Sequence, residues 1–188
     1  FLGRMQQLEA QERFYYPDTD EGRAQILADY TTIIEEIDEG LAPMFNKRPK
    51  AEVVVEREEL FKEETAAGAH YQPPPLDGSR PGRFVANLGD IKATPKFGMR
   101  TLAYHEAVPG HHYQIALSME NDALPLFRRV LPFTAYIEGW ALYSEQLAAE
   151  NGFQEDPFDR VGYLQAQLFR AVRLVVDTGI HRKRWTRE

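Results

Sequence analysis

The chain has 188 residues, a formal net charge of -7 at pH 7, 43% hydrophobic residues and no cysteine. This length fits one domain or part of a larger one, and no apolar run approaches the roughly 20 residues that span a bilayer. The negative charge disfavours nucleic acid as a partner, and the lack of cysteine excludes disulfides and thiolate ligands. A metal would therefore be bound by histidine and carboxylate side chains, which is typical of a catalytic zinc site.

We interpret the chain as a single region with three parts. A helical scaffold is expected over residues 1–48, strands and a loop rich in proline and glycine over 49–97, and helices that carry a candidate metal site over 98–188. The fold class that follows is mainly α with a small β-sheet of two or three strands (α+β).

The scaffold is predicted to contain two helices. Apolar residues recur at helical spacing over residues 1–14, and residues 15–18, which include a proline, interrupt the pattern. Asp20 is the expected N-cap of a second amphipathic helix, which Gly40 is expected to end.

The middle part is predicted to contain two strands. The β-branched run over residues 51–56 predicts the first strand, and residues 71–82, with four prolines and two glycines, predict a loop. The second strand is expected over residues 83–88, where Val85 and Asn87 share one face. An edge strand can pair with an extended peptide through main-chain hydrogen bonds, so Val85 and Asn87 are candidates for substrate binding. The alternative is an ordinary strand within the sheet.

The last part is predicted to be helical. The expected helices cover residues 98–105, 111–119, 126–130, 138–151 and 157–178. Gly152 and Gly179 are the expected C-terminal caps of the last two helices.

The stretch from Tyr104 to Gln114 combines a His-Glu step with a second pair of histidines. Zinc-binding helices commonly place two histidines four residues apart, whereas His111 follows His105 by six residues and His112 follows it by seven. On an unbroken helix His111 would lie about 120° round the axis from His105, and His112 about 10.5 Å along it. The Pro109-Gly110 step is expected to break the helix. We therefore predict His111 as the second ligand, with His112 as the alternative.

Glu138 is the predicted third ligand, because it begins a helix 27 residues after His111 and because Gly139 would let the main chain approach closely. Glu145 lies seven residues further, on a similar face, and is either a carboxylate that orients a ligand or a solvated one. Glu106 is the candidate general base. These residues together predict a site for one Zn²⁺ ion.

Three stretches, His105–His112, Glu138–Glu145 and Asp77–Phe84, resemble the bacterial domain of unknown function 885 family, and the resemblance covers roughly residues 70–188. That family looks related to the gluzincin metallopeptidases. The resemblance implies a zincin-like helical metallopeptidase region, with the ligands and the base named above. It also implies that the chain is the catalytic part of a larger protein, with the rest of the full-length chain as its partner, and that this protein is secreted or located in the cell envelope.

The predicted reaction is zinc-assisted hydrolysis of a peptide or a small amide. His181 or Tyr143 is the candidate donor to the oxyanion, although an exposed histidine and a core tyrosine are the ordinary alternatives. Asp177 is a candidate to orient a histidine, and Arg173 is a candidate to bind a substrate carboxylate; a surface ion pair is the alternative for both. Two other functions remain open, namely an amidase or esterase for small substrates and a non-catalytic peptide-binding module.

Overall fold

The computed structural model describes residues 2–186, which are mainly helical and include one small sheet. The helices are α1 (Leu2–Glu9), α2 (Asp20–Gly40), α3 (Lys96–Glu106), α4 (His111–Met119), α5 (Leu126–Val130), α6 (Thr134–Glu150) and α7 (Pro157–Lys183). The strands are β1 (Val53–Arg57), β2 (Ala69–Gln72) and β3 (Gly82–Ala86). The predicted class, mainly α with a small sheet, is confirmed. No helix among the described residues has both the length and the apolar character needed to cross a membrane.

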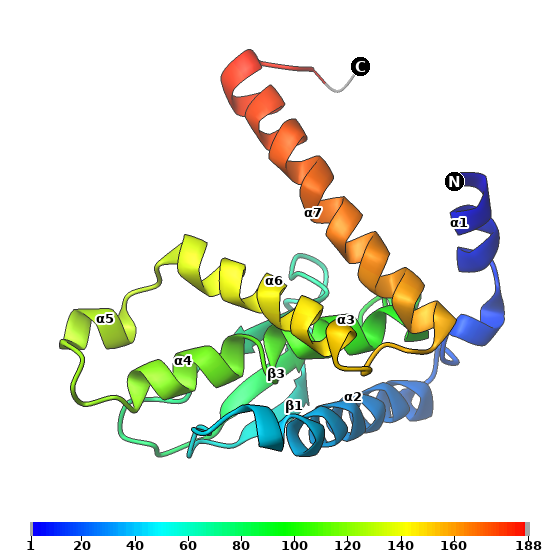
Figure 1. Cartoon of the computed structure of the whole chain (residues 1–188). Coiled ribbons are helices and arrows are strands. Elements are labelled where there is room, and N and C mark those ends of the chain that lie inside the picture. Colours follow the sequence, from blue (N-terminus) through cyan, green and yellow to red (C-terminus); the bar gives the residue numbers. More distant parts are fainter. Residues whose placement is uncertain (1, 187–188) are drawn as a thin grey trace.

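Helix α2 supports one side of the molecule. The Thr19 side chain, rather than Asp20, caps this helix by accepting a hydrogen bond from the main-chain N–H of Gly22 at 3.1 Å. Its apolar stripe enters the core, where the rings of Tyr30 and Phe84 lie 4.7 Å apart. This packing fixes the sheet against α2 (Figure 1).

The sheet has the order β1-β3-β2, with β3 parallel to β1 and antiparallel to β2. Strand β3 is therefore central, and the predicted edge position of Val85 and Asn87 is wrong. The side chain of Val85 is buried, and Asn87 donates from Nδ2 to the carbonyl oxygens of Glu63 and Ala66, at 2.8 and 3.0 Å. Both residues stabilise the sheet and the turn before it, because a central strand has no free edge to offer a peptide.

Strand β2 was not predicted, and it supplies the sheet edge nearest the histidines. The sequence pattern suggested a loop from residue 71, but Ala69–Gln72 pairs with β3 in antiparallel register. Local propensity did not identify this strand, since four residues next to a run of prolines acquire strand geometry only through their partner.

The predicted break between the two histidine groups is confirmed. Helix α3 ends at Glu106 and α4 begins at His111. A Cβ atom on Gly110 would lie 1.9 Å from the carbonyl oxygen of His105 and 2.3 Å from that of Tyr104. Only glycine fits here, so the turn folds back tightly onto the end of α3.

Helix α7 is longer than predicted. Gly152 ends the preceding segment with φ +87°, as expected for a glycine cap, but Gly179 lies inside α7 against the ring of Trp185. The C-terminal half of α7 extends away from the other helices (Figure 1). The N-terminal half of α7, as far as Arg170 in the middle of the helix, contacts α3 and α6.

Candidate metal centre

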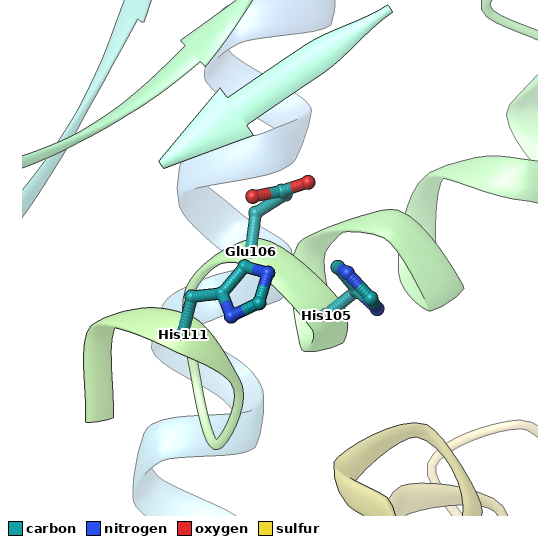
Figure 2. Close-up of side chains that lie close together, drawn as sticks. All are labelled: His105, Glu106 and His111. Carbon is teal, nitrogen blue, oxygen red and sulfur yellow. The ribbon is translucent and has the colours of Figure 1, made fainter. Parts of the chain in front are cut away.

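The break between α3 and α4 brings two histidines and a glutamate together (Figure 2). The rings of His105 and His111 have centroids 4.7 Å apart and planes at 81°. His105, Glu106 and His111 are all buried, and each offers a possible ligand atom within 4.8 Å of the others. Sequence spacing alone would have separated the two rings on a continuous helix.

The side chain of Glu138, from α6, lies close to both of these imidazoles. Its carboxylate oxygens lie 3.6 Å from His105 Nε2 and 3.7 Å from His111 Nε2. Four ligand atoms placed tetrahedrally at about 2.0–2.1 Å from one ion lie about 3.3–3.4 Å apart. The carboxylate therefore lies at nearly this separation from each imidazole, through a different oxygen in each case.

The reason given for Glu138 from the sequence is wrong, although the residue does reach the histidines. A Cβ atom on Gly139 would meet no described atom within 4 Å. Glu138 is placed instead by the packing of α6 against α3 and α4. Trp140 Nε1 and Ser144 Oγ both donate to the carbonyl of Pro109, at 2.7 and 3.1 Å, and so fasten α6 to the turn between the histidines.

Glu145 and Arg170 form an ion pair that contacts His105 at Nδ1, the ring nitrogen that does not face Glu138. His105 Nδ1 lies 2.7 Å from Glu145 Oε1, and Glu145 is fully buried. Arg170 of α7 lies 2.7 Å from the same carboxylate oxygen and 3.0 Å from His105 Nδ1. A carboxylate can only accept, so the bond to Glu145 places the proton on His105 Nδ1 and leaves the lone pair of Nε2 for a cation, while Arg170 donates to the carboxylate rather than to Nδ1.

Arg170 was missed in the sequence because no motif surrounds it. It reaches the site only because α7 packs closely along α3, where a Cβ atom on Gly162 would lie 1.8 Å from the carbonyl oxygen of Phe97. The glycine and the arginine are eight residues apart in α7. A helical face with a small residue followed by an arginine is too common to indicate a site.

His112 faces away from the cluster. Its Nε2 lies 3.1 Å from the carbonyl oxygen of Ala51 and therefore donates, and its Nδ1 lies 3.0 Å from the Tyr71 hydroxyl, from which it accepts. Burial lowers the pKa of His112 to about 4. Both ring nitrogens are occupied, so the structure directs His111, and not His112, toward Glu138.

Burial also sets the charges inside the centre. It raises the pKa of Glu106 to about 7, with the opposing charge of His105 and the like charge of Glu138 as smaller effects. It lowers the pKa of His111 to about 4, helped by the neighbouring His105 and Arg170. A neutral imidazole and a carboxyl group that exchanges its proton near neutrality are what a metal ligand and a general base require.

Four other predicted residues do not join the centre. Tyr143 is half exposed and lies about 140° round α6 from Glu138, with its ring against Trp140. Arg173 is exposed, with its guanidinium over the Phe169 ring at 5.5 Å. His181 and Asp177 form an exposed pair at 3.4 Å near the end of α7, which extends away from α3, α4 and α6 (Figure 1). In this chain the ordinary surface alternative describes His181, Asp177 and Arg173.

Comparisons with known proteins show a family and give similar solved structures. The family described as "Bacterial protein of unknown function (DUF885)" matches residues 1–188. Among solved structures, the chain is similar to one described as the putative lipoprotein from Colwellia psychrerythraea, with 52% identity and a TM-score of 0.96. That match covers 98% of this chain and 32% of the other, so the chain spans about a third of the length of that protein. A search of curated proteins gives no match.

Proposed function

The chain belongs to the DUF885 family of bacterial proteins of unknown function, and we propose that it carries the centre of a zinc-dependent metallopeptidase. The observation that supports this most directly is the approach of one Glu138 carboxylate to the Nε2 atoms of both His105 and His111, at 3.6 and 3.7 Å. Two imidazoles and one carboxylate form a common ligand set of catalytic zinc, which keeps a fourth position open.

The residues fit zinc by their chemistry as well as their spacing. His105 and His111 would bind the ion through Nε2 and Glu138 through its carboxylate, while Glu145 accepts the other proton of His105. When bound, zinc would act as a Lewis acid that polarises a carbonyl group and lowers the pKa of water. Both histidines and Glu106 are buried, whereas the Glu138 side chain is 54% exposed, so solvent and substrate can approach the centre from the side of α6.

Glu106 is proposed to move the proton. Its carboxylate lies beside the histidines, and burial raises its pKa to about 7. It would take a proton from the attacking water and return it to the leaving amine. This role explains why the buried Glu106 carboxylate lies beside the ligand residues. A purely structural metal site would not need it.

A peptide is the proposed substrate class because a sheet edge that no other strand of residues 2–186 covers adjoins the centre. Strand β2 is one of the two outer strands of the sheet, and it contacts both α3 and α4. An extended peptide can bind such an edge through main-chain hydrogen bonds. The similar structure is described as a putative lipoprotein, which supports a cell-envelope location as part of this proposal.

Metal content and turnover of the full-length protein test the proposal. Purified protein should contain one zinc per chain and cleave members of a peptide library, detected by mass spectrometry. The Glu106→Gln variant should keep the zinc and lose hydrolysis by about 10²–10⁴-fold. The exposed Glu64→Gln variant is the matched control and should keep both.

Absence of zinc binding, or full hydrolysis by Glu106→Gln, would overturn the proposal. Blocked amino acids and esters should be tested in parallel. Turnover of these small substrates without cleavage of any peptide would favour an amidase or esterase at the same centre.

A further inference from the structure

A small apolar cavity opens one helical turn from the proposed centre, and we propose that it receives a bulky aliphatic or aromatic side chain of the substrate. The inference rests on the proposed peptidase function and adds a substrate class to it. The cavity has a volume of about 280 Å³. Its apolar lining is supplied by Pro73, Ile115, Val130, Leu131, Phe133 and Ile137.

The cavity adjoins the ligand residues on two helices. Ile115 follows His111 by four residues, so the two lie on one face of α4 with Cβ atoms about 5–6 Å apart. Ile137 immediately precedes Glu138 in α6. A substrate whose scissile carbonyl sits at the centre would therefore place a neighbouring side chain at the mouth of the cavity.

The residues that line the cavity favour binding of an apolar side chain of limited size. Leu131 and Phe133, both in the link between α5 and α6, are 53% and 50% exposed, so apolar surface remains open to solvent. Cavities that bind a whole drug-sized molecule measure roughly 300–1,000 Å³, so this one suits a single large side chain. Covering these walls with an apolar group would remove them from water.

A polar side chain in the lining, that of Gln114, also favours a peptide as the molecule that occupies the cavity. Gln114 lines the same cavity and is 6% exposed. Its Nε2 donates to the carbonyl of Tyr136 at 3.2 Å, but its Oε1 is buried without a partner among the described residues. A main-chain N–H of a bound peptide would satisfy this acceptor if the Gln114 amide turned toward the cavity on binding.

Selectivity of the zinc-loaded full-length protein provides the test. Quenched fluorescent peptides would carry Leu, Phe, Ala, Gly, Asp or Lys at each position flanking the cleaved bond in turn. We expect one flanking position to prefer Leu or Phe over Gly by about ten- to hundredfold in kcat/KM.

Two variants at the exposed Leu131 identify the cavity as the source of this preference. Leu131→Glu should reduce the preference for Leu and Phe by about tenfold, since a carboxylate would share the cavity with them. Leu131→Trp should shift the preference toward Ala by filling the space. Leu164→Glu, at an exposed leucine of α7 outside the cavity, is the matched control and should keep the original selectivity.

Failure of the inference is distinguishable from failure of the proposed function. Peptide cleavage without an apolar preference, or an unchanged preference in both Leu131 variants, overturns the inference and leaves the peptidase proposal intact. Zinc binding without any cleavage overturns the peptidase proposal instead. Calorimetric titration of the Glu106→Gln variant with Leu and Gly peptides then tests whether the cavity binds an apolar side chain. Equal affinities for the two peptides overturn the inference. Tighter binding of the Leu peptide, if Leu131→Glu abolishes the difference, supports it.

Discussion

Glu145 Oε1 lies 2.7 Å from His105 Nδ1, and neither side chain is open to solvent. The two residues are 40 positions apart in the sequence and come from different helices. Arg170 donates to the same carboxylate, and the pair of contacts fixes the imidazole with Nε2 toward Glu138. The ion pair of Glu145 and Arg170 thus orients His105, the proposed ligand, through its Nδ1 atom.

Replacing Glu145 with Gln should weaken zinc binding about 10–100-fold, because the neutral amide holds His105 less firmly and leaves Arg170 without its counter-charge. Competition with a chromophoric zinc chelator measures the affinity. Glu150→Gln, an exposed change in the same helix, should leave it unaltered. Equal affinities in Glu145→Gln and the parent protein would contradict the orienting role.

Adding one methyl group at Gly110 should disrupt the turn between the histidines. The new Cβ would lie 1.9 Å from the carbonyl oxygen of His105, so Gly110→Ala should lower the free energy of unfolding by more than about 2 kcal/mol and weaken zinc binding. Urea denaturation of the metal-free protein measures the first effect. Gly98→Ala is a matched control within α3, where the new Cβ would lie 3.8 Å from the Pro95 side chain, and it should be neutral or slightly stabilising. Similar stabilities of the two variants would show that the close approach does not control the turn.

The two neighbouring histidines should respond differently to alanine. His111→Ala should abolish stoichiometric zinc binding. His112→Ala should retain zinc but lose roughly 1–3 kcal/mol of stability, because the Tyr71 hydroxyl and the Ala51 carbonyl lose a buried partner. Metal analysis and thermal unfolding separate the two effects. The opposite pattern, with zinc lost only in His112→Ala, would exchange their roles.

Alkaline pH should destabilise the fold through its buried phenols. Burial, with a smaller effect from the charge of Glu106, raises the pKa of Tyr30 above its ordinary value near 10. Above pH 10 the unfolded chain releases this proton while the folded chain keeps it, so stability present below pH 10 falls as pH rises. Tyr30→Phe should make the fall in unfolding free energy less steep by about 1.4 kcal/mol per pH unit, measured by urea denaturation between pH 10 and 12. An unchanged slope would mean that Tyr30 ionises equally in both states.

Much of the helical architecture could be predicted because it depends on local periodicity. The break between α3 and α4 also followed from the sequence, since Pro109 in the interior of a helix would lack the N–H needed to bond to the His105 carbonyl and its ring would clash there. Strand β2 could not be found in this way, because its geometry depends on pairing with β3. The central position of β3 was missed for the same reason.

The sequence by itself determined which chemical groups were available: histidines and carboxylates without cysteine, grouped around a proline-glycine break. Only the tertiary structure decided which of them meet. His111 faces Glu138 while His112 turns to Tyr71 and Ala51, and Arg170 joins the centre while His181 stays at the exposed end of α7. The physical reason is that residue types and helix breaks are local properties, whereas the direction of a side chain toward a shared point depends on how helices distant in sequence pack.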